Sequence, residues 1–365
     1  MKDCNIVKDW PENELEQVVS CPVCGSDGRR LLYKGLTDKV YYSVPGMWQL
    51  QQCLKCESAF LDPRPTPSSI WRAYTNYVTH KSTEVDIPLT EMNFRQRLRR
   101  ALSNGYINSK YGANLQPSSR LGKWLLPLIY GKQGEIDHAL RGLPMLVKGE
   151  KRKVLDIGCG SGSFLKVAMQ LGWEVQGIDP DSKAASAASQ VSGLCVEQGG
   201  LPKTRFQDST FDVVTLSHVI EHTHDPVASL REAYRLLKPG GRIWVATPNL
   251  KSGSCRYFHM NWIGLHPPAH LVLFNHKSLR DVLGLAGFHN VRVAKMSLHS
   301  KGYFHMSWRI SRGEEPFSAT GSPLPLYLRL LALVSDLLSV LQINRREEIV
   351  MIATKPATTT SAQSS

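Results

Sequence analysis

Residues 154–164 read Val-Leu-Asp-Ile-Gly-Cys-Gly-Ser-Gly-Ser-Phe and decide the fold of this chain. An apolar strand leads into glycines at alternate positions, and a helix is expected from Phe164 to Met169. A second strand, Glu174–Ile178, follows and ends at Asp179. A strand, a glycine loop, a helix, a strand and an acid in this order are typical of a Rossmann-type nucleoside site. The pattern therefore predicts an α/β fold.

The spacing of the glycines discriminates between two nucleoside cofactors. Residues 158–162 read G-x-G-x-G, whereas a dinucleotide loop usually has a third Gly or Ala where this chain has Ser163. Asp156 would repel a pyrophosphate but suits the ammonium of a methionine group. An acid at position 179 can accept both ribose hydroxyls. These features favour S-adenosylmethionine over NAD, and a glycine loop without a ligand is the remaining alternative.

The composition is that of a globular protein. At 365 residues the chain fits one large or two modest domains, and a hydrophobic share of 42% permits a sizeable core. The N-terminus lacks a signal-peptide pattern, and no run of about 18 uncharged apolar residues suggests a membrane span. We therefore expect a cytoplasmic protein with eight reduced cysteines.

The net charge of +13 is unevenly distributed. From Arg95 to Lys153 there are thirteen Lys and Arg residues against three Asp and Glu. This basic segment suits an anionic partner such as nucleic acid, a nucleotide-activated sugar or an acidic membrane surface. Solvated helix faces are the plainer alternative.

The chain divides into segments of different character. In order, they are a zinc-ribbon-like module at 1–66, a basic helical segment at 67–150, the alternating strand-and-helix segment at 151–356 with an insertion at 300–346, and a tail at 357–365. The Ser/Thr-rich tail is expected to be disordered. Breaks in the helical segment are expected at Gly105, Gly112 and Pro117.

The alternating segment contains signals for further strands and helices. Helices are expected at Pro226–Leu237 and at Ser278–Ala286, the second capped by Ser278. The further strands are expected at Leu194–Gln198, Phe211–Leu216, Arg242–Thr247, Val291–Met296 and Glu347–Thr354.

Several blocks of this segment resemble class I S-adenosylmethionine-dependent methyltransferases. They comprise residues 154–162, 178–179, 209–222, 236–243, 268–270 and 286–288. The resemblance covers about residues 150–356 and implies a seven-stranded Rossmann-like methyltransferase sheet with an antiparallel last strand. It is greatest to the subgroup that includes ubiquinone-type O-methyltransferases and bacterial sugar or polysaccharide methyltransferases, some of which carry an N-terminal four-cysteine module.

The resemblance also implies which residues hold the cofactor. The glycines would cradle it, Asp156 would face its methionine end and Asp179 would take the ribose. The family often has an acid before a Leu-Pro turn, which is missing at 199–202, so backbone there is expected to meet the adenine. The expected cofactor-binding residues are Asp156, Gly158, Cys159, Gly160, Gly162, Asp179, Gly200, Leu201 and Ser217.

The residues after the fourth strand are candidates for catalysis, because ligands bind at the carboxyl ends of strands in open α/β sheets. A hydroxyl acceptor must lose a proton, and His222 or His218 suits the role of base. His270 lies in a later loop where the family places acceptor contacts, and it is a further candidate. A structural role for these residues is the alternative.

The same residues also suggest a metal. In the ubiquinone-type subgroup, E-x-x-E-H at this place is associated with a divalent metal, and here His218 replaces the first acid. A second divalent metal at His218, Glu221 and His222 would then be of the zinc kind. The pattern H-x-x-E-H also occurs in inverted zinc proteases, but that motif needs a helix.

Two C-x-x-C pairs lie near the N-terminus, Cys21 with Cys24 and Cys53 with Cys56. Four thiolates in two close pairs suit a tetrahedral structural zinc, and redox disulfides or unpaired thiols are the alternatives. The spacer is expected to form a small hairpin region with strands at Leu31–Tyr33, Val40–Tyr42 and Trp48–Gln51.

The insertion contains an apolar helix. Within 324–341 only Arg329 and Asp336 are charged, and the leucines and valine that recur at helical spacing are Leu330, Leu331, Val334, Leu337, Leu338 and Leu341. This face is expected to pack as a lid over the active site or as an oligomer contact. The alternative is a peripheral contact with the inner face of the membrane.

Taken together, the sequence predicts methyl transfer from S-adenosylmethionine to a small-molecule, sugar or lipid-linked acceptor, at a hydroxyl. A nucleic-acid methyltransferase using the zinc module and the basic segment is one alternative. It is disfavoured because no Asn/Asp-Pro-Pro-Tyr/Phe motif follows the fourth strand. A cofactor-binding protein without turnover is the other. The acceptor, the choice of O- or C-methylation and the oligomeric state are left open.

Overall fold

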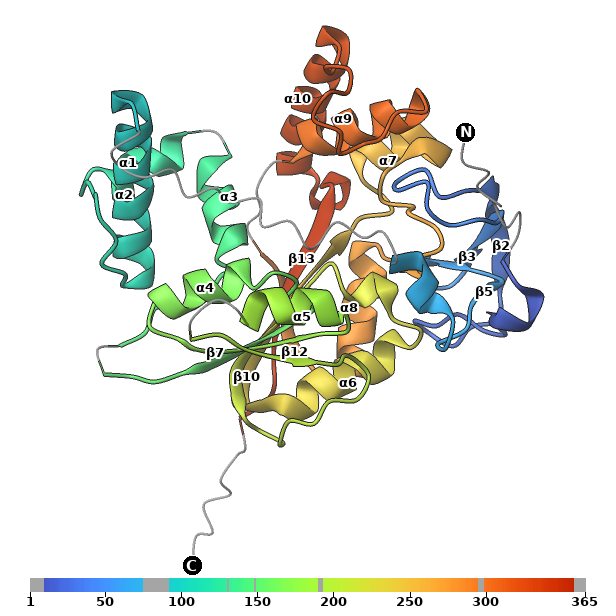
Figure 1. Ribbon diagram of the computed structural model, residues 1–365, viewed down its shortest axis with the longest axis horizontal. Helices are drawn as coiled ribbons and strands as arrows, with labels where there is room; N and C mark the ends of the chain where they lie inside the picture. Colours follow the sequence, from blue (N-terminus) through green and yellow to red (C-terminus); the bar gives the residue numbers. More distant parts are fainter. Residues whose placement is uncertain are drawn as a thin grey trace, which may run out of the picture.

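A seven-stranded sheet with the strand order β12-β13-β10-β9-β6-β7-β8 lies at the centre of the structure (Figure 1). The structure is a computed structural model that describes residues 10–74, 92–129, 131–147, 149–189, 193–294 and 299–357. Strand β13 runs antiparallel to β10 and β12, and the neighbouring pairs from β10 to β8 are parallel. The predicted Rossmann-like methyltransferase sheet with an antiparallel last strand is confirmed.

The strands lie close to their predicted positions. Their bounds are β6 Lys153–Ile157, β7 Glu174–Asp179, β8 Cys195–Gln198, β9 Phe211–Ser217, β10 Leu237–Pro248, β12 His289–Val293 and β13 Glu348–Thr354. Strand β10 begins earlier than predicted, with an irregular register between Leu237 and Arg242. Met296, at the end of the predicted sixth strand, lies outside the described residues, as do Cys4, Lys148 and 358–365.

Helices cover both faces of this sheet. Helices α4 (Ser163–Gln170) and α5 (Ser182–Ser189) lie on one face, and α6 (Pro226–Leu236) lies on the other, where it contacts α8 (His276–Leu285) (Figure 1). Neighbouring strand residues alternate between the two cores. Val154 packs in the cluster that contains α4 side chains, whereas Leu155 packs in the cluster that contains α6 and α8 side chains. This alternation follows the two-residue repeat of a strand.

The start of α8 differs from the prediction. Its N-cap is Asn275, whose side chain accepts hydrogen bonds from the backbone N–H groups of Lys277 and Ser278. Ser278 sits three residues later and donates its hydroxyl proton to the Asn275 backbone carbonyl at 3.1 Å. The prediction of Ser278 as the N-cap is therefore wrong, because the helix begins earlier, at His276. Ser278 is its third residue and accepts from the Asn275 N–H at 2.9 Å in a capping box.

The cysteine module shares a sheet with the alternating strand-and-helix segment. Strands β2 (Arg29–Leu36), β3 (Trp48–Cys53) and β4 (Ala59–Leu61) are joined by β11 (Val272–Leu273) in the order β11-β4-β3-β2. The predicted strand at 40–42 is a turn instead. The carboxylate of Asp38 accepts hydrogen bonds from the backbone of Val40, Tyr41 and Ser43, which holds this turn in place.

The basic segment forms helices α1 (Phe94–Tyr111), α2 (Gly122–Leu125) and α3 (Lys132–Ala139). Gly112 ends α1 with a left-handed φ of 72°, as a helix C-terminus requires. The predicted break at Gly105 is wrong, because Gly105 lies inside α1. A Cβ there would stand 1.8 Å from the backbone oxygen of Ser119, so glycine serves close packing at this position.

The insertion forms α9 (Ser300–Ser311) and α10 (Leu326–Leu341), which pack with α7 (Gly253–Phe258). The predicted apolar face of α10 points outward. The residues that α10 buries are Leu328, Ala332, Ser335, Asp336 and Ser339. A Cβ on Gly253 would lie 2.0 Å from the Ser335 hydroxyl oxygen, so small residues allow the close approach of α7 and α10. The expectation of a buried lid is thus wrong for this face.

Among the described residues, no helix combines the length and the apolar character needed to cross a bilayer.

We predict that Gly105→Ala destabilises the helical segment. The new methyl group would overlap the Ser119 carbonyl, and overpacking of this kind costs about 1–3 kcal/mol or more. Gly284→Ala is the matched control, since it also lies in a helix but has open space around it. That variant should be neutral or more stable by up to about 1 kcal/mol. Urea denaturation of both variants checks the prediction, and equal stabilities would contradict it.

Candidate active site and metal-binding clusters

The glycine loop and Asp179 form one unit at the carboxyl ends of β6 and β7. Gly158, Gly160 and Gly162 have φ values of 70°, 53° and 76°, in the region that favours glycine. The Gly160 N–H donates to Asp179 Oδ2 at 2.8 Å, and the Asp181 N–H donates to Oδ1 at 2.9 Å. The structure therefore brings together the residues that the sequence assigned to the nucleoside.

The expected adenine-side residues follow the neighbouring strands at the same sheet edge. Gly199 comes directly after β8 and its N–H donates to the Asp179 backbone oxygen at 2.9 Å, and Gly200 and Leu201 follow it. Ser217 ends β9. Cys159 is buried in the loop, and burial raises the pKa of its thiol, so its role is packing rather than reactivity.

Asp156 has a partner that the sequence did not reveal. The carboxylate is fully buried, and its Oδ1 accepts from the Thr215 hydroxyl at 2.8 Å and pairs with Arg141. Burial raises the pKa of Asp156 in spite of the arginine. Its Oδ2 has no hydrogen-bond partner within the described part of the chain. The cationic side chain of Arg141 thus lies beside Asp156, at the place where the sequence predicted the methionine end of the cofactor.

Arg141 has no local signature that sequence reasoning could have used. It follows α3 and is 15 residues from Asp156, and its guanidinium lies 4.1 Å from the centre of the Phe164 ring. Packing of the helical segment against the sheet brings it to the glycine loop. Its positive charge suits the carboxylate of a methionine group.

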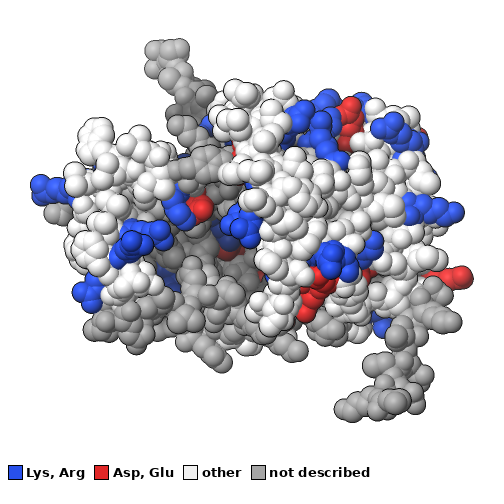
Figure 2. All heavy atoms as spheres, turned by 90° about the horizontal axis from the view of Figure 1, so that it is seen from above, with Lys and Arg blue, Asp and Glu red and all other residues white. Residues whose placement is uncertain are grey.

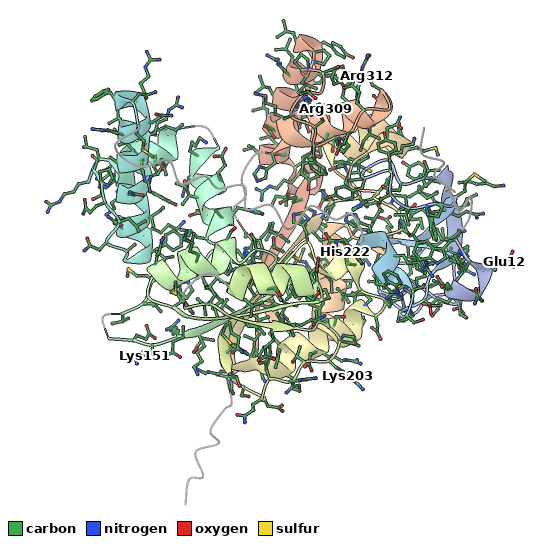
Figure 3. The ribbon with its side chains drawn as sticks, in the orientation of Figure 1. Glu12, Lys151, Lys203, His222, Arg309 and Arg312 are labelled. Carbon is green, nitrogen blue, oxygen red and sulfur yellow. The ribbon has the colours of Figure 1, made fainter. Side chains whose placement is uncertain are left out.

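A cluster of Glu221, His222 and His270 lies after β9, and each residue offers a ligand atom within 4.8 Å of the others. The 3-10 helix η6 (Ile220–His222) positions the first two, and Figure 3 shows His222 near the middle of the molecule. His222 Nδ1 lies 2.9 Å from the Ala269 carbonyl oxygen, and His270 Nδ1 lies 2.8 Å from that of Gly264. A carbonyl only accepts, so both Nδ1 atoms carry the proton and both Nε2 atoms keep a lone pair.

Burial keeps these histidines neutral. It lowers the pKa of His222, lowers that of His270 well below its usual range, and lowers that of the neighbouring His266 to about 4. The imidazoles of His222 and His270 are therefore available at neutral pH to accept a proton or to bind a metal ion.

His218 has a different environment from His222. Its Nδ1 lies 3.3 Å from Glu221 Oε1 and its Nε2 lies 3.4 Å from Glu348 Oε1. Burial opposes the charge, but the two carboxylates outweigh it and raise the pKa of His218 to about 10. Water screens part of this attraction, since the side chain is 37% exposed. A protonated His218 is a poor base, so the geometry favours His222 for that role.

The metal cluster thus differs in one member from the expected set. His270, rather than His218, joins Glu221 and His222. Glu221 is fully buried, and its Oε2 accepts from the Thr247 hydroxyl at 3.0 Å. Its Oε1 faces His218 Nδ1 at 3.3 Å without the alignment of a hydrogen bond among the described residues. Two neutral imidazoles and a carboxylate form a donor set used by zinc enzymes, so these residues fit a divalent ion.

The four cysteines of the N-terminal module converge on one point. The Sγ atoms of Cys21 and Cys56 are 3.6 Å apart, as are those of Cys24 and Cys53. A disulfide would hold its sulfurs about 2.05 Å apart. Tetrahedral zinc with Zn–S bonds of about 2.3 Å separates them by about 3.8 Å. The observed arrangement therefore fits a structural zinc ion.

We predict that Cys24→Ser removes one equivalent of zinc and destabilises the protein. A structural zinc site contributes directly to folding, so a loss on the order of 3 kcal/mol or more is expected. Cys195→Ser is the matched control, because Cys195 is exposed and outside the cluster. Metal analysis and thermal unfolding with and without chelator test both variants. An unchanged zinc content in Cys24→Ser would contradict the assignment.

Comparison with known proteins identifies the central segment. The family described as "Methyltransferase domain" matches residues 132–293. Ubiquinone biosynthesis O-methyltransferase from Pseudomonas aeruginosa (strain LESB58) is 36% identical over 104 residues, which are 27% of this chain and 45% of that protein. The enzyme of the same name from Proteus mirabilis is 33% identical over 108 residues, 27% of this chain and 42% of that protein. The chain therefore spans less than half the length of these relatives.

Solved structures of methyltransferases are also similar at low identity. A SAM-dependent methyltransferase from Archaeoglobus fulgidus is 22% identical with a TM-score of 0.38, covering 56% of this chain and 86% of that one. One from Mesorhizobium loti is 17% identical with a TM-score of 0.39, covering 60% and 96%.

The family match includes the glycine loop, Asp179 and the cluster after β9, and the sheet has the order and the antiparallel strand expected for the family. Residues 132–293 therefore form a methyltransferase domain of the class I, S-adenosylmethionine-dependent type.

Proposed function

We propose that this protein transfers the methyl group of S-adenosylmethionine to a hydroxyl of a small-molecule or glycan acceptor. The observation that carries the proposal is the neutral His222, which lies beside Glu221 and His270 at the sheet edge that holds the glycine loop. The printed names of the relatives, which are O-methyltransferases, support a hydroxyl as the acceptor.

The donor side of the site holds the cofactor by its two polar ends. Asp179 is fixed by two backbone amides and would accept hydrogen bonds from the ribose hydroxyls. Arg141, held by Asp156 and by the Phe164 ring, would face the methionine carboxylate. A clamped cofactor presents its methyl group in one direction, and in-line displacement depends on such alignment.

The acceptor side of the site provides a base for the hydroxyl proton. As the acceptor oxygen bonds to the methyl carbon, the carbon–sulfur bond breaks and its electron pair stays on S-adenosylhomocysteine. The hydroxyl proton passes to Nε2 of His222, whose Nδ1–H is held by the Ala269 carbonyl. The alternative is a divalent metal held by Glu221, His222 and His270. It would occupy Nε2 of His222 and would lower the pKa of a bound hydroxyl in place of the base.

We predict that His222→Ala lowers kcat by about 10²- to 10⁴-fold, the usual contribution of a general base. Its affinity for S-adenosylmethionine should change little, since the glycine loop and Asp179 are intact. His289→Ala, at an exposed histidine on β12, is the control and should behave as wild type. Radiolabelled methyl transfer to extract fractions and calorimetric cofactor binding measure the two quantities.

The pH dependence of the methyl-transfer rate also tests the role of His222 as the base. The rate should fall on acidification as Nε2 of His222 takes up a proton, and this limb should lie below the ordinary pKa of 6.5 because burial lowers it. Cofactor binding without any release of S-adenosylhomocysteine would instead support a binding protein. A salt-dependent affinity for RNA or DNA would favour a nucleic-acid acceptor.

We further propose that α10 contacts an anionic lipid surface, which would suit a lipid-linked acceptor. Leu337 and Leu341 on its outer face are 63% and 77% exposed. The single acid of the helix, Asp336, is buried. Figure 2, which looks down on the side where α10 projects, shows more Lys and Arg than Asp and Glu. An apolar helix face among cations is typical of interfacial binding.

We predict that Leu337→Glu abolishes sedimentation of the protein with vesicles of phosphatidylglycerol and phosphatidylcholine. The introduced carboxylate would be repelled by the anionic lipid and would remove apolar contact area. Leu285→Glu is the control, since Leu285 is 52% exposed on α8, outside the insertion. If wild type does not sediment but dimerises through α10, as sedimentation velocity would show, the lipid proposal fails.

A further inference from the structure

A third cluster of ligand-type side chains lies at the same sheet edge and belongs to neither site above. His138 comes from α3, His299 directly precedes α9, and Glu348 begins β13. Each offers one ligand atom, and these atoms lie within 4.8 Å of one another. Residues from three distant segments of the chain therefore converge on one point.

Two buried atoms of this cluster lie close together but do not form a hydrogen bond with each other. His138 Nε2 lies 3.1 Å from Glu348 Oε2, yet the pair lacks the alignment of a hydrogen bond. Neither atom has another hydrogen-bond partner among the residues that the structure describes. Leaving a buried polar atom without a partner destabilises the folded protein. A cation held between the two atoms would satisfy both.

The other carboxylate oxygen of Glu348, Oε1, already has two polar contacts. Glu348 Oε1 accepts from the Tyr303 hydroxyl at 3.0 Å and faces His218 Nε2 at 3.4 Å. These contacts fix the carboxylate and leave Oε2 directed to the histidines. The His138 ring is also held in place, with its centre 5.4 Å from that of Trp244 and 5.5 Å from that of His299.

We propose that His138, His299 and Glu348 bind a divalent metal ion of the zinc class. Two imidazoles and one carboxylate form a known three-residue ligand set for zinc, which leaves a fourth position for water or another oxygen. Hard ions such as Mg²⁺ prefer oxygen ligands throughout, so the two imidazoles select against them.

Such an ion would connect three segments that are far apart in the sequence. Figure 1 shows α3 and α9 as separate bodies flanking β13. One ligand from each, with Glu348 between them, would tie the helical segment to the insertion. Because Arg141 lies two residues beyond the end of α3, the ion would also fix the element that carries this arginine.

The test counts metal ions on the full-length protein. After chelation and dialysis, wild type is titrated with Zn²⁺ and the tightly bound equivalents are measured by elemental analysis. We expect His299→Ala and His138→Gln each to bind one equivalent fewer than wild type. His289→Ala should bind the wild-type amount, because this exposed histidine lies outside all three clusters. Circular dichroism confirms that each variant is folded.

Two further variants separate this site from the others. Cys24→Ser removes the ion of the cysteine cluster and His222→Ala removes any ion at Glu221, and neither should affect the site at His299. Titration with Co²⁺ in the double variant Cys24→Ser/His222→Ala should give a visible spectrum typical of nitrogen and oxygen ligands, without thiolate charge transfer. That spectrum should disappear when His299→Ala is added.

Hydrogen exchange provides a readout that needs no variant. In wild type, Zn²⁺ added beyond the first equivalent should slow amide exchange both in 132–139 and in 300–311. Equal metal content in wild type and His299→Ala would overturn the proposal. So would unchanged exchange in both segments. Neither result depends on whether the protein methylates a hydroxyl.

Discussion

The antiparallel insertion of β13 between β10 and β12 is the constraint on which the rest of the site depends. Because β13 runs against its neighbours, its first residue pairs with Pro248 at the carboxyl end of β10. That reversal brings Glu348 to the edge where β6, β7 and β9 also end. Glu348 then contacts His218 after β9 and His138 from α3. A parallel strand would have placed the same carboxylate at the opposite edge.

The sequence was most informative where function depends on local backbone. The glycine loop, Asp179 and the strands around them follow from spacing and period alone, and they lie where spacing placed them. It was least informative where a residue meets a distant one. In the sequence, Gly105 resembles a helix break, and only the fold shows that it lies against Ser119. Likewise, the sequence does not distinguish Arg141 from the other cations, and only the fold places it beside Asp156.

The same limit explains the histidines and α10. The spacing of His218 and His222 in the sequence does not distinguish their roles. In the fold, carboxylates that include the distant Glu348 raise the pKa of His218, whereas burial lowers the pKa of His222. Periodicity identified the apolar stripe of α10 but assumed that it packs inward. Hydrogen bonds among Ser300, Ser335 and Glu347 instead direct the small, polar side of this helix to the protein.

The four-stranded sheet that contains β4 and β11 connects the cysteine module directly to the backbone around Glu221 and His270. The Leu61 N–H donates to the Leu271 carbonyl, and the Leu271 N–H donates to the Glu221 carbonyl, at 3.0 and 2.8 Å. Leu271 directly follows His270. Two peptide hydrogen bonds thus connect the cysteine module to both sides of the acceptor site. The folding of the cysteine module therefore also fixes the backbone that carries Glu221 and His270.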